Sequence, residues 1–167
     1  SDLIARLDAD DFSFSQRLEK QVTFMEKHPD IVLCGSRWLE LAGEKLSKQI
    51  VDFVETDQAI KKSMSLFNPF SHSGVIFRKK TFITAGGYSE RFKYSQDYDL
   101  WLRMLAFGKT LILKEELAVV RMSEQSESHK NARKQKLEAL QIRWDAFQQF
   151  GGNPGQALYY LFKNQGF

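Results

Sequence analysis

Residues 3–11 read LIARLDADD, a short apolar run that ends in three carboxylates, those of Asp8, Asp10 and Asp11. The run predicts a strand over residues 3–7, and apolar residues at helical spacing predict a helix after it. Proteins of the α/β class bind ligands where such strands end. Two interpretations stay open here. The carboxylates hold a divalent cation through oxygen ligands, or they form a solvated acidic turn ahead of a helix N-terminus.

The rest of the chain alternates strands and helices of unequal length. Strands are expected over residues 31–35, with residues 36–41 as an extension of that strand, and over residues 73–78, 110–113 and 117–121. Helices are expected over residues 56–67, 79–85, 98–107, 128–150 and from Pro154 onward. This irregular order predicts an α/β fold with a mixed sheet flanked by helices, not a regular doubly wound series. We expect one domain over residues 1–127 and a helical extension over residues 128–167 that packs on it.

Length and composition limit the classes of protein. A chain of 167 residues with 43% apolar and 27% charged residues has room for one globular core and is unlike a disordered or fibrous protein. Its apolar runs are too short for a helix that spans a bilayer, and no signal peptide is visible. The single cysteine, Cys34, reads as a small buried apolar residue, so a reducing cytoplasmic compartment is expected.

The predicted helix over residues 128–150 combines positive charge with an apolar stripe. Its basic residues are Lys130, Arg133, Lys134, Lys136 and Arg143, and its stripe consists of Leu137, Leu140, Trp144 and Phe147. Packing of the stripe against the core is the favoured interpretation, and contact with an anionic membrane surface is the alternative. A nucleic-acid site is disfavoured because the basic patch is small and lacks interleaved aromatic residues.

Three further motifs each allow a structural and a functional interpretation. Asp97 lies just before a predicted helix, where it either caps the helix or faces a pocket as a general base. Gly86 and Gly87 either end a helix or let the backbone approach a ligand closely. His72 precedes a strand, and a lone histidine is more often a hydrogen-bonded structural residue than a ligand.

Taken in order, these segments resemble family-2 glycosyltransferases with the GT-A fold. The resemblance rests on DADD at residues 8–11, HSGVIFR at residues 72–78, GGYSE at residues 86–90 and QDYDLWLR at residues 96–103. Each motif is weak alone, and their order makes the match specific. The resemblance covers roughly residues 3–126 and implies a partial GT-A-like fold and a nucleotide-sugar-dependent transferase.

The family's site roles carry over by position. The resemblance implies inverting, metal-dependent transfer of a sugar from a UDP- or GDP-sugar to a glycan or lipid-linked acceptor, in cell-envelope polysaccharide biosynthesis. It implies that Asp97 is the catalytic base and that Asp10 and Asp11 hold Mn²⁺ or Mg²⁺. The nucleotide-sugar diphosphate would meet Asp8, Asp10, Asp11, His72 and Arg121. The sugar and acceptor pocket would be lined by Gly86, Gly87, Tyr88, Gln96 and Trp101.

The sequence departs from the family pattern in three ways. Gln96 stands where glutamate is common, Ser123 stands where the family often has a histidine, and the chain begins at the acidic strand without the family's amino-terminal nucleotide-binding half. We therefore expect this chain alone to be inactive. The alternative is a non-catalytic fragment that binds a partner or forms a homodimer through an exposed sheet edge. The expected location is the cytoplasm, at the inner face of the cell membrane.

Overall fold

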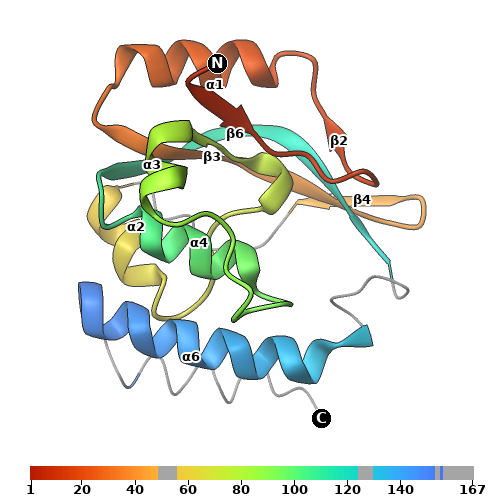
Figure 1. Ribbon diagram of the computed structural model, residues 1–167. Helices are drawn as coiled ribbons and strands as arrows, with labels where there is room; N and C mark the ends of the chain where they lie inside the picture. Colours follow the sequence, from red (N-terminus) through yellow and green to blue (C-terminus); the bar gives the residue numbers. More distant parts are fainter. Residues whose placement is uncertain (49–55, 124–129, 153–154, 156–167) are drawn as a thin grey trace.

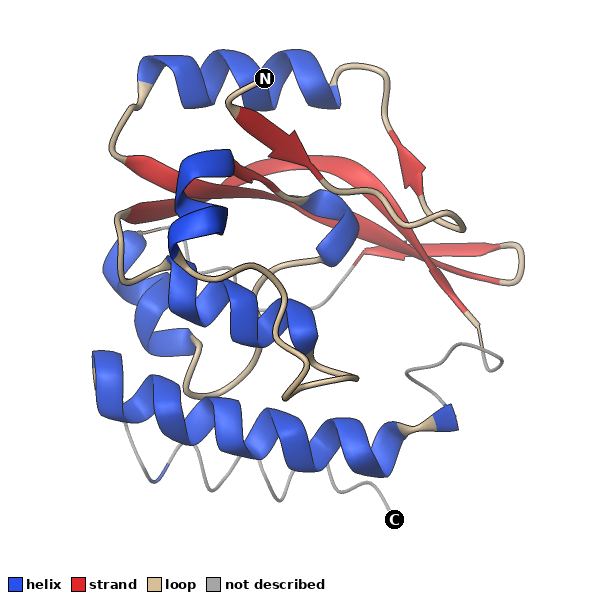
Figure 2. Cartoon of the chain, viewed as in Figure 1, coloured by secondary structure: helices blue, strands red, loops and turns tan. Residues whose placement is uncertain are grey.

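The computed structural model describes residues 1–48, 56–123, 130–152 and 155. Six strands form one mixed sheet, and helices lie on both of its faces (Figures 1 and 2). The predicted α/β class with a mixed sheet is therefore confirmed. The helix predicted from Pro154 onward falls almost wholly outside the described residues.

The centre of the sheet is a parallel pair of long strands. The strand order is β1-β5-β3-β6-β2, and β4 pairs with the outer part of β3. Only β3 and β6 run parallel, and the other pairs are antiparallel. The strand bounds are Leu3–Ala5 (β1), Phe12–Ser13 (β2), Ile31–Ala42 (β3), Lys45–Lys48 (β4), Ile76–Arg78 (β5) and Lys109–Met122 (β6).

Strand β6 replaces the two strands predicted over residues 110–113 and 117–121. Ser36 pairs with Leu113 and Arg37 pairs with Glu116, so the register shifts at this point. A bulge of this kind takes up extra residues without ending the strand. The charged residues that interrupt the apolar pattern therefore lie in an irregular part of one strand, not in a loop between two.

Helix α1 lies on one face of the sheet, while α2 and α4 lie on the other (Figure 1). The bounds are Arg17–Lys27 (α1), Asp57–Ser63 (α2), Lys79–Thr84 (α3), Gln96–Met104 (α4) and Ala132–Phe150 (α6), with a 3₁₀ turn, η1, at His72–Gly74. Two of the predicted helices have wrong bounds, because α2 stops at Ser63 instead of residue 67, and α4 spans Gln96–Met104 instead of residues 98–107.

Helix α6 forms an outer layer against α2 and α4. Ile142 and Ala146 are its fully buried side chains, and Ala139 also packs against the core. The prediction that the stripe of large apolar residues packs against the core was wrong, because Leu137 and Trp144 are each 60% exposed and Leu140 is 37% exposed. Small alanines let the opposite side of α6 approach α4 closely. In the described part of the chain, no helix is long and apolar enough to span a bilayer.

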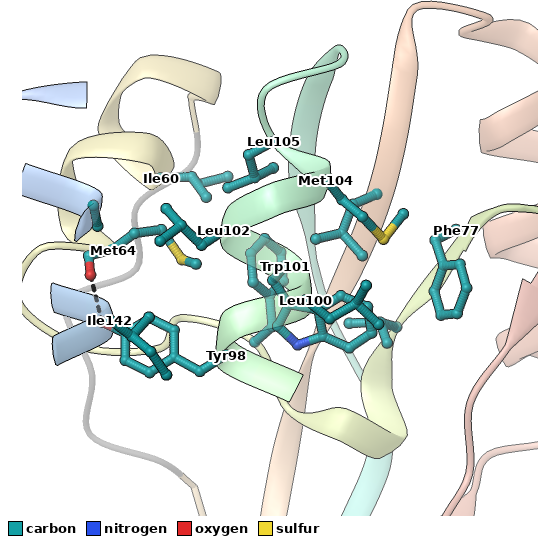
Figure 3. Close-up of a cluster of buried hydrophobic side chains, with 14 of the residues drawn as sticks. Ile60, Met64, Phe77, Tyr98, Leu100, Trp101, Leu102, Met104, Leu105 and Ile142 are labelled. Carbon is teal, nitrogen blue, oxygen red and sulfur yellow. Dashed lines mark hydrogen bonds between the residues drawn. The ribbon is translucent and has the colours of Figure 1, made fainter. Parts of the chain in front are cut away.

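The larger hydrophobic core fills the space between the sheet and the helices α2, α4 and α6 (Figure 3). Trp101, Leu100 and Met104 of α4 have no exposed surface, and they place this helix against the sheet. Tyr98 closes the core toward α6, and its hydroxyl donates a hydrogen bond to the carbonyl oxygen of Met64. Helix α4 is therefore fixed along its whole length, which makes its first turn a rigid support for polar groups.

A buried guanidinium joins α1 to the opening strand. Arg17 is 1% exposed, and its Nη2 donates to the carbonyl oxygens of Arg6 (2.7 Å) and Val75 (2.9 Å). Its Nε donates to Gln21 Oε1 at 3.0 Å, and Gln21 Nε2 donates to the carbonyl oxygen of Gly74 at 2.8 Å. Burial lowers the pKa of Arg17. Among the described residues no carboxylate pairs with it, so neutral oxygens alone solvate the charge.

Replacement of Arg17 by methionine should lower the free energy of unfolding by about 2–4 kcal/mol, because buried carbonyl oxygens then lose their donor. Urea unfolding followed by circular dichroism measures this change. Lys20→Met is the matched control, because Lys20 makes an exposed ion pair with Glu115 (2.8 Å) that contributes about 0–1 kcal/mol. Equal losses in the two variants would contradict a structural role for the buried charge.

Candidate active site

Polar side chains from three segments meet beyond the end of β1. They come from the loop that follows β1, from η1, and from the turn after α3. The meeting point is set by Arg6, whose backbone N–H donates to the carbonyl oxygen of Val75 at 3.1 Å. The Asp8 backbone N–H donates to Ser73 Oγ at 3.0 Å. The acidic loop is therefore attached directly to η1.

The His72 side chain contacts three of these polar side chains. Arg6 Nε donates to His72 Nε2 at 3.1 Å, and the Tyr88 hydroxyl lies 2.8 Å from the same nitrogen. Because an arginine can only donate, Nε2 is the acceptor and the proton is on Nδ1. Nδ1 lies 3.1 Å from Asp8 Oδ2, to which it donates. The predicted diphosphate-site residues Asp8 and His72 and the predicted pocket residue Tyr88 are thus brought together.

The environment of Asp8 keeps its carboxylate ionised. The hydrogen bond from His72 lowers the pKa of Asp8, as do the charge and hydrogen bond of Arg6, whose Nη2 lies 2.7 Å from Oδ1. Burial acts in the opposite direction and does not reverse the shift. Both oxygens of Asp8 are therefore occupied by protein donors.

Asp11 and Asp10 differ in how they are held. Asp11 accepts hydrogen bonds from the Ser73 hydroxyl and, at 2.8 Å, from the backbone N–H of Arg121. Arg121 Nε donates to the backbone carbonyl oxygen of Asp10 at 3.2 Å. The Asp10 side chain is exposed, and no described residue donates to its carboxylate. Arg121, which the resemblance assigned to the diphosphate, therefore lies beside the acidic loop.

Asp97 lies in the first turn of α4 and is half-buried. The structural interpretation of Asp97 as the helix cap is wrong, because Ser95 occupies the N-cap position. Burial raises the pKa of Asp97, and it outweighs the opposing effects of His72, of the backbone N–H groups of this turn and of the Asn68 hydrogen bond. Asn68 Nδ2 donates to Asp97 Oδ2 at 3.0 Å. A carboxylate with a raised pKa is suited to accept a proton.

The turn that contains Gly86 and Gly87, here called the glycine turn, is held by a side chain of α4. Gly86 and Gly87 have φ angles of +84° and +64°, a conformation that favours glycine and ends α3. Arg103 donates to the carbonyl oxygens of Ala85 and Gly87, and its Nη2 also lies 2.7 Å from Asp99 Oδ2. The partly buried Asp99–Arg103 pair, which the motifs did not single out, thus attaches the turn before Tyr88 to α4.

The two remaining pocket candidates differ in exposure. Gln96 is exposed at the start of α4, beside Asp97. Trp101 is fully buried, so its ring belongs to the core, with its centroid 5.4 Å from that of Phe77 and 6.1 Å from that of His72. Its indole N–H has no hydrogen-bond partner among the described residues.

The acidic loop does not by itself supply a complete set of metal ligands. Within the described residues, no group of three His, Cys, Asp or Glu side chains is arranged to hold a metal ion. Mg²⁺ bound with a diphosphate needs only one or two protein carboxylates, because phosphate oxygens and water complete its shell. The carboxylate of Asp10, which is exposed and has no donor among the described residues, could supply one such ligand.

The geometry can be compared with known proteins. Residues 1–140 match the sequence profile of glycosyltransferase-like family 2. The amylovoran biosynthesis glycosyltransferase AmsE of Erwinia amylovora is 37% identical over 106 residues, which are 64% of this chain and 39% of that protein. The UDP-Gal:alpha-D-GlcNAc-diphosphoundecaprenol beta-1,3-galactosyltransferase of Escherichia coli is 35% identical over 107 residues, 64% of this chain and 38% of that protein.

The fold is also similar to solved structures. The crystal structure of residues 1–349 of S. aureus TarS superposes with a TM-score of 0.58 at 12% identity, covering 99% of this chain and 48% of that one. This similarity confirms the predicted GT-A-like fold. The matches cover about two fifths of the length of both curated relatives named above. On the profile match and these relatives, the chain belongs to glycosyltransferase-like family 2.

Proposed function

We propose that this chain carries the base and the diphosphate-binding loop of an inverting, cation-dependent glycosyltransferase. The observation that carries the proposal is Asp97, a partly buried carboxylate whose pKa is raised by burial and which interacts electrostatically with His72. Burial raises the pKa of Tyr88, and the charges of Asp97 and Asp8 raise it further, so both carboxylates act on one side chain of the cluster formed by Arg6, Asp8, His72 and Tyr88, here called the His72 cluster. One reaction centre can therefore use both the Asp8 and the Asp97 carboxylates.

The proposed step is a single displacement at the anomeric carbon. An acceptor hydroxyl oxygen forms the new bond to that carbon, the bond to the diphosphate oxygen breaks, and the hydroxyl proton passes to Asp97. A base is effective here because the proton becomes acidic only as the new bond forms. Mn²⁺ or Mg²⁺ held at Asp10, with Asp11 beside it, would offset the charge on the departing nucleoside diphosphate.

The substrates are proposed from the relatives. The Escherichia coli relative is named for a UDP-sugar donor and a lipid-linked diphosphate acceptor. A UDP- or GDP-sugar and a glycan or lipid-linked acceptor of cell-envelope polysaccharide are accordingly proposed for this chain. A lipid-linked acceptor is carried by a membrane, so the enzyme would work at a membrane surface.

Helix α6 has a surface suited to that location. Arg133, Leu137, Leu140 and Trp144 recur at helical spacing on one face and are all exposed. Basic and apolar groups together on one face favour an anionic lipid surface, because the charges attract headgroups and the apolar side chains enter the interface. We propose that this face contacts an anionic membrane.

Replacement of Asp97 by asparagine should lower the transfer rate by about 10²–10⁴-fold and leave donor affinity unchanged, since a base acts only in the reaction step. In active preparations of the protein, the wild-type rate should fall as the pH drops through a pKa above the ordinary aspartate value of 3.8, because the protonated carboxyl cannot accept a proton. Asp30→Asn, a matched change in an exposed pair with Lys109 (2.9 Å), should have no effect. Equal loss of donor binding and turnover would make Asp97 structural.

Replacement of Asp10 by alanine should weaken cation-dependent nucleotide binding about tenfold or more, because one charged ligand is lost. Calorimetric titration with UDP and GDP, with and without Mn²⁺, measures this directly and needs no turnover. Asp30→Ala serves as the control. If Mn²⁺ raises nucleotide affinity equally in the wild type and in Asp10→Ala, the cation is not held by Asp10.

Flotation with vesicles rich in phosphatidylglycerol should recover the protein at low salt, and added salt should release part of it. The double variant Leu137→Ser/Trp144→Ser should reduce the floated fraction about tenfold. Leu46→Ser removes an apolar side chain of similar exposure (52%) from β4 and should leave flotation unchanged. Absence of wild-type flotation, or an equal loss in both variants, would refute the membrane contact.

A further inference from the structure

Asn68 lies in the segment between α2 and η1, and its side-chain amide joins this segment to α4. Its Oδ1 accepts a hydrogen bond from the backbone N–H of Phe70 at 3.1 Å, and its Nδ2 donates to Asp97 Oδ2 at 3.0 Å. A backbone N–H can only donate, so the amide oxygen must face Phe70 and the amide nitrogen must face Asp97. The orientation of the amide is therefore set by the backbone, independently of Asp97.

The support behind Asn68 is rigid. Pro69 restricts the backbone on its carboxyl side, and Phe70 is 4% exposed within the main core. A Cβ on Gly35 of β3 would lie only 2.8 Å from Cδ1 of the Phe70 ring, so this ring rests directly on the backbone of the central strand. The sheet thus fixes Phe70, Phe70 fixes the Asn68 amide, and the amide fixes one oxygen of Asp97.

Few other described side chains near Asp97 interact with its carboxylate. His72 of η1, Tyr88 of the glycine turn and Tyr98 of α4 interact with it electrostatically. Asn68 is the only described side chain with a hydrogen bond to this carboxylate. The other oxygen, Oδ1, receives no side-chain donor from the described residues, and the remaining donors to this carboxylate are the backbone N–H groups of Asp97 and Tyr98.

We propose that Asn68 is a positioning residue, which holds Asp97 Oδ2 so that Oδ1 faces the acceptor. This inference rests on the proposed role of Asp97 as the base. The Asn68 hydrogen bond also favours the ionised carboxylate, which opposes the effect of burial. Asn68 therefore positions the base and favours the form that can accept a proton.

Asn68→Asp separates this role from a turn-forming one. The new side chain has nearly the same volume and still accepts from Phe70, but it presents a second carboxylate to Asp97 instead of a donor. Like charges disfavour ionisation, so the acidic limb of the pH profile of kcat/KM should move to higher pH by about one unit or more. The rate at neutral pH should fall at least about tenfold, while the melting temperature stays close to that of the wild type. An unchanged profile and rate would overturn the proposal.

Two further measurements separate the possible failures. A carbon-13 NMR titration of the Asp97 carboxyl in this chain needs no turnover and should show a higher pKa in Asn68→Asp than in the wild type. Asn131→Asp, at the N-cap of α6, is the matched control and should leave that pKa unchanged. If Asp97→Asn retains full transfer activity, the proposed function fails. If Asp97→Asn is inactive and Asn68→Asp matches the wild type in both experiments, only the positioning role fails.

Discussion

The buried guanidinium of Arg17 is the interaction on which the site depends. It donates to the backbone at Arg6, where β1 gives way to the acidic loop, and at Val75, where η1 gives way to β5. Gln21, one turn further along α1, reaches Gly74 in the same segment. A charge solvated by carbonyl oxygens is costly to bury, and removing it would strand those oxygens. The two backbone segments that carry Asp8 and His72 are thus held together by hydrogen bonds from side chains of α1.

The other half of the site is built on α4, and its rigidity has a different source. Trp101 and Met104 bury the helix in the core, while the Asp99–Arg103 pair fastens the glycine turn to the outer side of the same helix. Helix α4 therefore positions both Tyr88 and Asp97 beside His72. Arg17 of α1 holds the neighbouring backbone at Arg6 and Val75. Groups that are held before substrate arrives do not have to reorganise in the transition state, which is where fixed polar groups are most effective.

Local patterns in the sequence were sufficient for the class of fold, because helices and strands depend on residues near one another in the chain. Periodicity located β3, α1 and α4, whereas Asp8, Asp97 and Tyr88 became site candidates through the resemblance to glycosyltransferases. Contacts between distant residues were not predictable in this way. Asn68 reaches Asp97 across 29 residues and His72 reaches Asp8 across 64. The face of α6 that packs was also missed, since hydrophobic size favoured the stripe with Trp144, while close packing on α4 favoured Ala146.

The three carboxylates of the acidic loop illustrate how a crowded charge motif becomes a site. Three like charges in four positions repel one another, and the fold gives two of the carboxylates hydrogen-bond partners. Asp8 is matched by Arg6 and His72, and Asp11 by the Ser73 hydroxyl and the backbone of Arg121. These contacts give the loop one shape, and they leave the Asp10 carboxylate exposed without a described partner. A site that satisfied all three internally would have no attraction for a cation, and one that satisfied none would not hold its shape. The remaining negative charge is therefore the part of the motif to which we assign the proposed cation.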